Sequence, residues 1–557
     1  MEDVMKLDKL LPYASLALYL CVQSSQAQQE HQHHAAAGKP ERLGTVSFQI
    51  SCLAAPQSDF NRAVALLHTF WYDEARKAFT ELSSKDPTCG MAYWGIAMTL
   101  YHPLWAPPSS SELKEGWAAV QKAKAVGAKT QRELDYIGAI GTFYMDFENV
   151  THRMRALAYE KAMENLYLRY PDDGEAAIFY ALALNGTALP EDKTYANQKK
   201  AGEILEKIFT AESDHPGVAH YIIHSYDYPP LANRGLDAAR RYAKIAPSSP
   251  HVLHMPSHIF TRLGLWQESI ESNIASAAAA RDHVQKTRPG AASFDELHAM
   301  DYLVYAYLQG GQDGEAKRIV EKIRNMEAFD EENFAAAYAL AAMPVRYALE
   351  RRSWSEAAVL TLQPQKFSWE RLPYAEALVH FGRALGAARS GRPADARPTI
   401  ERIHSIKSSL SNAKQNYWAD QVEILRLAAS AWTTYAEGKK DEALKLMQAA
   451  ADLESNTEKH PVTPGAVLPA RELLGDMFME LKEPERALRE YETSLKTSPG
   501  RFNGLYGAAQ AARISGAEKL AQKYFADLVA NCSRADTNRP ELSEAKAFLG
   551  PYLKTKE

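Results

Sequence analysis

Histidines gather in one short stretch of this 557-residue chain: six of the 17 lie between His215 and Trp266. Most of them form two sets whose members are three or four residues apart, namely His220, His224 and Asp227, then His251, His254 and His258. On a helix, such spacing places side chains on one face. Imidazoles and carboxylates gathered on one face can bind a metal ion or transfer protons.

The first set has the spacing of a metal-binding helix. Pro216 suits the first turn of a helix, because its missing N–H needs no partner there. His220 and His224 are then one turn apart, as in HExxH zinc sites, but Tyr221 follows His220, so the glutamate base of those enzymes is absent. Asp227 either completes a two-histidine, one-carboxylate ligand set or orients an imidazole from behind.

The second set is interrupted by Pro256. A proline disfavours the helical conformation of the residue before it. We therefore expect a helix that begins at Pro256 and carries His258, with His251 and His254 on the loop that leads into it. The three histidines then lose their common face, although they can still converge in space. Met255 adds a soft ligand suited to Cu(I).

The elements that must position these residues are helical. From about Val46 onward, apolar residues recur at three- and four-residue spacing, and Gly, Pro and Asp interrupt the pattern at short intervals. Only residues 45–52 alternate as a strand would. The chain is therefore predicted to be all-α, built of short helices in successive hairpins.

Residues 471–499 resemble a tetratricopeptide repeat (TPR). The matching positions are Leu474, Gly475, Phe478, Ala487, Tyr491 and Pro499. The next unit follows in phase, and looser matches extend upstream. The resemblance implies a right-handed superhelical solenoid of antiparallel helical hairpins, in which small residues allow close helix approach and aromatic residues fill each hairpin. It also implies a concave groove for a peptide or small-molecule ligand, and protein partners at the C-terminal units.

The first helix of each hairpin should line the concave surface, where further polar and aromatic residues join the central histidines. These predicted pocket residues are His68, Tyr72, His102, His298, Asp301 and Tyr302. Such a pocket suits a metal ion or a polar ligand.

An imidazole-rich ligand set without thiolates favours copper or zinc, and Fe(II) if Asp227 is a ligand. Three other interpretations stay open: a metal-free pocket of acid–base or binding groups, hydrogen bonding between hairpins, and a metal-free scaffold for proteins or peptides. The sequence has no phosphate-binding loop and no nucleophile elbow, and it selects no reaction.

The remaining sequence features concern location and partners. The apolar run at residues 10–22 and the small residues before position 28 predict a signal peptide at 1–27, and thus a periplasmic or secreted protein. A flexible His-containing tail (28–45), a divergent TPR-like array carrying the histidines (46–454) and C-terminal TPR hairpins (455–557) should follow. A net charge of −5 gives no support for a nucleic-acid partner, and no run is long enough for a membrane span. Of the four cysteines, Cys52 and Cys89 could pair.

Overall fold

The computed structural model describes residues 41–52, 57–104 and 107–553. The predicted signal peptide and nearly all of the predicted His-containing tail lie outside these residues. Residues 42–557 form one unit. In the described parts of the chain the secondary structure is helical, apart from an isolated bridge between Ala292 and Phe329. The prediction of an all-α chain is confirmed.

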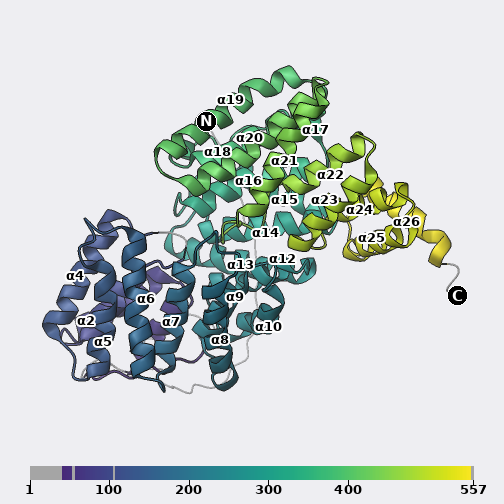
Figure 1. The fold of residues 1–557 in the computed structure, drawn as a ribbon. Coiled ribbons are helices and arrows are strands. Elements are labelled where there is room, and N and C mark those ends of the chain that lie inside the picture. The colour runs from purple at the N-terminus through teal and green to yellow at the C-terminus, as the bar shows by residue number, and fades with distance from the viewer. Residues whose placement is uncertain (1–40, 53–56, 105–106, 554–557) are drawn as a thin grey trace, which may run out of the picture. The chain divides into compact units, whose positions relative to one another are not determined.

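The helices follow one another along the chain and pack mainly against their sequence neighbours (Figure 1). The first half comprises α1 (Gln57–His68), α2 (Tyr72–Lys85), α3 (Gly90–Thr99), α4 (Ser110–Val126), α5 (Gln131–Tyr144), α6 (His152–Arg169), α7 (Gly174–Thr187), α8 (Ala196–Ala211), α9 (Pro216–Tyr226), η1 (Ala232–Gly235), α10 (Leu236–Ile245), α11 (Pro250–His254), α12 (Pro256–Arg262) and α13 (Trp266–Thr287). The second half comprises α14 (Phe294–Gln309), α15 (Asp313–Arg324), α16 (Phe334–Glu350), α17 (Trp354–Ala357), η2 (Trp369–Arg371), α18 (Pro373–Arg389), α19 (Pro393–Asn412), α20 (Asn416–Ala436), α21 (Lys440–Asn456), α22 (Ala470–Glu480), α23 (Pro484–Thr497), α24 (Phe502–Ile514), α25 (Glu518–Asn531) and α26 (Pro540–Leu553).

The hairpins at the C-terminus show why small residues recur in the repeat. Gly475 on α22 and Gly507 on α24 both face the ring of Tyr491 on α23, and a Cβ added at either glycine would come within 2.8 or 2.4 Å of that ring. Tyr491 is buried and donates a hydrogen bond to Asp476 at 2.6 Å. Close approach of helices around an aromatic side chain is the packing that the TPR resemblance implies. The array is TPR-like.

Residues 45–52, which alternate like a strand, are irregular. Side chains rather than a neighbouring strand hold this segment. The Phe48 N–H donates to Oδ1 of Asn61 at 3.2 Å, and Gln57 donates back to the Phe48 carbonyl at 2.7 Å. A disulfide joins Cys52 to Cys89 at the start of α3. The apolar side chain of Phe48 is buried beneath α1 and α3, which accounts for the alternating pattern.

The buried apolar side chains form two clusters. One runs from Leu43 to Phe260 and the other from Trp266 to Ala545. Helices α9, α11 and α12 belong to the first cluster, and α14 belongs to the second (teal in Figure 1). The histidine-rich helices therefore lie where the two clusters meet.

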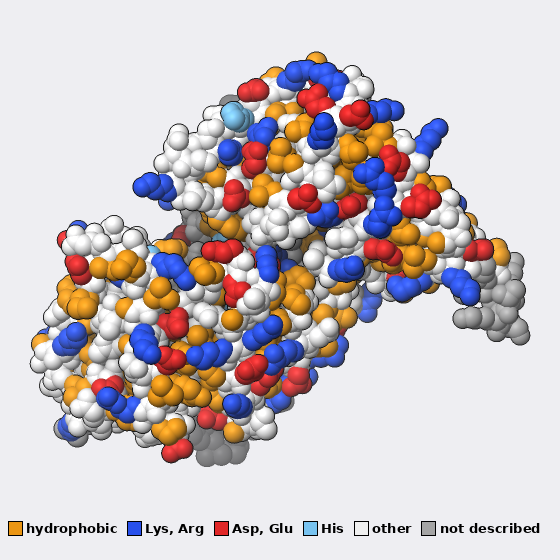
Figure 2. All heavy atoms as spheres, viewed as in Figure 1, with side chains coloured by type: hydrophobic (Ala, Val, Ile, Leu, Met, Phe, Trp, Pro, Cys, Tyr) orange, Lys and Arg blue, Asp and Glu red, His pale blue; other side chains and the backbone are white. Residues whose placement is uncertain are grey.

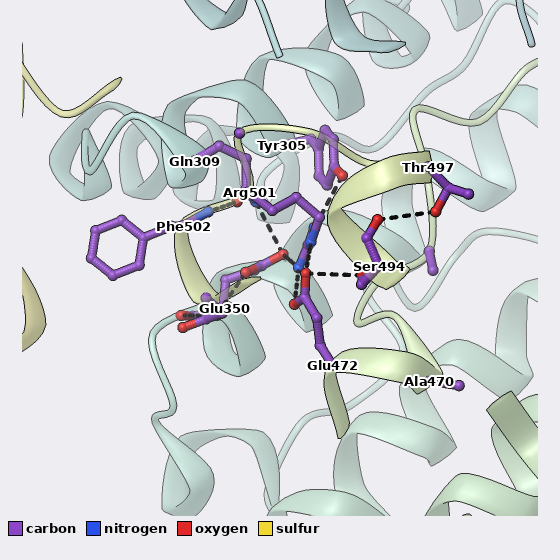
Figure 3. Close-up of polar contacts among 12 residues, drawn as sticks. Tyr305, Gln309, Glu350, Ala470, Glu472, Ser494, Thr497, Arg501 and Phe502 are labelled. Atoms are coloured by element: carbon purple, nitrogen blue, oxygen red, sulfur yellow. Dashed lines mark hydrogen bonds and ion pairs between the residues drawn. The ribbon is translucent and has the colours of Figure 1, made fainter. Parts of the chain in front are cut away.

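A buried arginine ties the C-terminal hairpins to the middle of the chain (Figure 3). Arg501, which precedes α24, donates to Glu472 at 2.6 and 3.0 Å, to Glu350 at 2.7 Å and to the Tyr305 hydroxyl at 3.0 Å. All four residues are fully or nearly fully buried. The several partners of each charge offset the cost of taking it out of water.

The proline-rich segment 455–469 is the loop between α21 and α22. Its Gly465 and Ala466 carbonyls accept hydrogen bonds from the buried guanidinium of Arg346 at 2.6 and 2.8 Å. This fixes the loop against α16 and brings residues 458–460 close to the histidines.

Charges of both signs are interspersed over the coloured surface of the face drawn in Figure 2. Neither sign forms an extended patch there. None of the helices within the described residues has the length and apolar character needed to cross a membrane.

Candidate metal centre

Helix α9 carries the first two histidines as the spacing predicts. Pro216 occupies its first turn, and the ring of His215 accepts the Gly217 N–H before it at 3.2 Å. His220 and His224 then lie one turn apart on the same face, with their Nε2 atoms 3.0 Å apart. His220 is fully buried and His224 is 8% exposed.

The prediction that His251 and His254 lie on a loop is wrong. Both belong to the short helix α11, and α12 begins at Pro256 almost without a break. Met255 between them keeps helical angles (φ −53°, ψ −36°), and its N–H donates to the His251 carbonyl at 2.9 Å. Pro256 therefore removes one N–H donor without unwinding the chain. Met255 is buried in the first apolar cluster.

Three histidines form what we call the first triad: His220, His224 and His251. The Nε2 atom of His220 lies 3.0 Å from that of His224 and 3.2 Å from that of His251. One ring nitrogen from each residue lies within 4.8 Å of the other two. Three nitrogens at these separations can share one cation.

Three further histidines form the second triad: His254, His258 and His298. The first two approach with their Nε2 atoms 3.0 Å apart, and His298 comes from α14 to lie with its ring centre 4.2 Å from that of His254. Tyr302, one turn further along α14, places its hydroxyl 3.4 Å from Nδ1 of His258. The ligand nitrogens again lie within 4.8 Å of one another.

The outward nitrogens of three of these rings face oxygen acceptors. Nδ1 of His220 lies 2.6 Å from the backbone carbonyl of His68. Nδ1 of His254 lies 2.6 Å from Oδ1 of Asn273, whose amide nitrogen donates to the Ser269 carbonyl. Because a carbonyl oxygen can only accept, both Nδ1 atoms carry the hydrogen.

The third outward nitrogen, Nδ1 of His258, donates to the carboxylate of Asp227 at 2.9 Å. Asp227 also accepts from Arg262 at 2.8 Å and from Lys459 at 3.2 Å. Burial alone would raise the pKa of Asp227, but Lys459 and Arg262 outweigh it and hold that pKa well below its usual range. Asp227 is therefore an ionised acceptor behind His258, and both of its oxygens are engaged.

Burial favours the neutral form of the rings in the two triads. Burial, and after it the neighbouring imidazoles, hold the pKa of each of five rings well below the ordinary histidine value: His220, His224, His251, His254 and His298. Burial also lowers the pKa of His258, although Asp227 opposes this effect. A neutral imidazole with its hydrogen on Nδ1 has a bare Nε2. The facing Nε2 atoms of His254 and His258 are both of this kind.

A third group of titratable residues lies behind the first triad and differs from it. Glu175 accepts from His68 at 2.9 Å and from His215 at 3.1 Å. The second ring nitrogens of these histidines pair with the Tyr221 hydroxyl and the Gly217 N–H. Every ring nitrogen therefore has a partner, and this group forms a hydrogen-bond network. It fixes His68, predicted as a pocket residue, so that its carbonyl faces His220.

Phe70 covers the first triad and has no counterpart in the sequence prediction. Its ring centre lies 4.4 Å from that of His220, 5.7 Å from that of His224 and 5.8 Å from that of His251. Its backbone is left-handed (φ 56°), which is uncommon for a large side chain and is often retained at functional sites.

A cavity of about 460 Å³ adjoins the first triad. Its lining includes His102, His224, Asp227, Arg262, Trp418 and Lys459. Burial lowers the pKa of the Lys459 ammonium to about 8, although Asp227 opposes this. The cavity thus offers cations, a carboxylate and an aromatic wall beside one imidazole of the triad.

The other predicted pocket residues lie in different places. His102 lines the cavity, and Tyr72 packs edge-on against it with ring centres 4.7 Å apart. Asp301 instead lies in the core, where it accepts from Arg346 at 3.1 Å and is 2% exposed. Its partner Arg346 lies on α16, and Asp301 belongs to neither histidine triad.

No known family matches the sequence, and no curated protein matches it. Among solved structures, the human IFIT1 dimer with m7Gppp-AAAA aligns at a TM-score of 0.37 and 10% identity, over 79% of this chain and 90% of IFIT1. A chain of the APC/C hetero-tetramer Cut9–Hcn1 aligns at a TM-score of 0.27 and 13% identity, over 89% of both chains. A chain of Naa15/Naa10 bound to HypK-THB aligns at a TM-score of 0.23 and 12% identity, over 89% of this chain and 91% of that one. Scores this low add nothing to the fold and site described above.

Proposed function

We propose that this protein is a metalloprotein that holds two copper or zinc ions, one in each histidine triad. The observation that carries the proposal is the contact between His254 and His258. Their Nε2 atoms lie 3.0 Å apart, and the acceptors behind both rings place both hydrogens on Nδ1. Two bare nitrogen lone pairs repel at this distance, and a cation between them turns the repulsion into two bonds.

The spacing of the nitrogens supports the same proposal. Imidazoles bind copper and zinc at about 2.0–2.1 Å, so two ligands of one tetrahedral ion lie about 3.3 Å apart. The measured Nε2 separations of 3.0 and 3.2 Å are close to this value. A small shift of the rings would admit the ion.

The surroundings of the triads also suit a metal. Metal-binding histidines usually donate their second ring nitrogen to a carboxylate or a carbonyl, which orients the ring and makes it a stronger ligand. His220, His254 and His258 do so, to His68, Asn273 and Asp227 respectively. Asp227 takes this supporting role, which removes the reason to expect iron.

The cavity beside His224 supports a small polar or aromatic ligand that approaches the first triad. Lys459 and Arg262 would bind an anionic group, and the indole of Trp418 would stack against a flat ring.

We place the protein in the periplasm or outside the cell. The apolar run at residues 10–22 supports export, as does the Cys52–Cys89 disulfide, since disulfides persist in oxidising compartments. Mass spectrometry of protein secreted by its host tests this. A mature chain that begins at Gln28 is expected, and an intact N-terminus would contradict it.

The metal proposal is tested by elemental analysis of protein purified without a histidine tag. Two ions per chain are expected, and the His220→Ala/His224→Ala variant should lose one. His283→Ala/His404→Ala, which removes two histidines outside the triads, is the matched control and should keep both ions. If the wild-type protein holds no metal, or the triad variant holds as much as the control, the protein is better described as a metal-free scaffold.

A further inference from the structure

We infer that the two triads form one coupled dicopper centre that binds dioxygen between its metal ions. This inference rests on the proposed metal binding and specifies it: the ions are copper, they act as a pair, and the ligand is O₂.

The nearest rings of the two triads are no farther apart than the most widely separated rings within each triad. Ring centres of His224 and His258 are 6.3 Å apart, and those of His251 and His254 are also 6.3 Å apart. Within the first triad the widest ring separation is 6.4 Å, between His224 and His251. The six rings therefore make one continuous cluster, and ions in the two halves would share the space between them.

The charge of the ligand set indicates which ion the cluster holds at rest. An imidazole that binds a metal through one nitrogen is a neutral ligand, and neither candidate ligand group includes a carboxylate. The nearby charge of Asp227 is already matched by Arg262 and Lys459. Two divalent ions would place four positive charges in a buried site whose protein ligands are neutral, so they would need anions from the solvent with them. Two Cu(I) ions would place only two positive charges there.

A reaction with dioxygen would leave the charge of this site unchanged. Each Cu(I) gives one electron to O₂, which becomes a peroxide dianion bound between two Cu(II) ions. Two electrons leave the metals and two arrive on oxygen, and no proton is needed. The total charge of the centre stays at two positive charges, so the buried site accepts the oxidised pair together with its anion.

Each triad leaves room for such a ligand. Three protein ligands per ion leave at least one coordination position open, as in catalytic metal sites. The cavity lined by His224 reaches the first triad, and the ring of Phe70 packs against all three of its histidines. Dioxygen therefore has a route in, and bulk water has restricted access.

The test begins with the full chain loaded anaerobically with two equivalents of Cu(I), followed by exposure to O₂. We expect uptake of one O₂ per chain, an intense near-ultraviolet peroxide-to-copper band, and no electron paramagnetic resonance signal, because the spins of two bridged Cu(II) ions cancel. The His254→Ala/His258→Ala variant, checked for folding by circular dichroism, should bind one copper and give an ordinary Cu(II) signal. Zinc-loaded protein should take up no oxygen.

The outcomes separate this inference from the proposed function. Two bound coppers that give two independent Cu(II) signals, or that do not react with O₂, overturn the coupled centre and leave metal binding intact. Fewer than two bound metals in the wild-type protein overturn the proposed function and this inference with it.

Discussion

The Nε2 atoms of His254 and His258 face each other at 3.0 Å, and neither carries a hydrogen. In each ring Nδ1 donates its hydrogen to an oxygen, that of Asn273 for His254 and that of Asp227 for His258, and this fixes the tautomer. The contact is therefore unfavourable for the protein alone and becomes favourable with a cation. Metal binding and stability should be coupled as a consequence.

Zinc should stabilise the folded chain. A ligand present at 100 times its dissociation constant raises the free energy of unfolding by about 2.7 kcal/mol, which for a chain of this size corresponds to about 2 °C in Tm. Differential scanning calorimetry with zinc, and again after addition of a chelator, measures the shift. A Tm that zinc does not change, or changes equally in His220→Ala/His224→Ala, would contradict this prediction.

Asp227→Asn should weaken metal binding about 10- to 100-fold, since the loss of a carboxylate behind a histidine ligand typically has this effect. The asparagine can still accept from His258 but no longer makes its ring more basic. Titration against a competing chelator measures the affinity. Asp237→Asn, which changes an exposed carboxylate on α10, is the control and should bind like the wild-type protein. Equal affinities for the two variants would show that Asp227 has no part in the site.

Arg501→Leu should lower the free energy of unfolding by about 3–5 kcal/mol, because it leaves the buried carboxylates of Glu350 and Glu472 without their shared cation. Arg489→Leu, on the exposed face of α23, should change it by less than about 0.5 kcal/mol. Urea unfolding of the two variants compares these values, and similar destabilisation by both would mean that the buried network contributes little.

Glu376 makes stability depend on pH. Burial alone would raise its pKa, but hydrogen bonds from His380 and Arg402 outweigh this and lower the pKa from 4.5 to about 2. The ionised Glu376 therefore makes its full contribution to the free energy of unfolding above pH 4.5, and this contribution is lost as the pH falls towards 2. Because Arg402 is half-exposed, solvent screens its interaction with Glu376. We therefore expect Glu376 to contribute about 1–2 kcal/mol to the free energy of unfolding at pH 5. The difference in unfolding free energy between wild type and Glu376→Gln should be present at pH 5 and nearly absent at pH 2. A difference that does not depend on pH would exclude this pair as its source.

The sequence predicted the fold well because local patterns determine it. Three- and four-residue apolar spacing, and small residues such as Gly475 opposite Tyr491, depend on contacts within a helix or between neighbouring hairpins. The prediction of a loop before Pro256 was wrong because it considered only the local preference of the chain. The preference of Met255 against helix is weaker than the packing of α11 and α12 against α13, and tertiary contacts decided the conformation.

The site was only partly predictable. His220, His224, His251, His254 and His258 are close in sequence and stood out by their spacing. His298 was recognised as a pocket residue, but its place beside His254 depends on how α14 packs, and no sequence pattern encodes that. Lys459 belongs to a proline-rich loop more than 200 residues from Asp227, so only the folded chain brings the two together.

Anomalous X-ray diffraction from crystals grown with copper, recorded above and below the copper absorption edge, tests the central claim most directly. We expect two anomalous peaks per chain, one within about 2.0–2.1 Å of the Nε2 atoms of the first triad and one equally close to one ring nitrogen of each histidine of the second. The absence of a peak at either triad, or copper bound only at histidines elsewhere in the chain, would contradict the account.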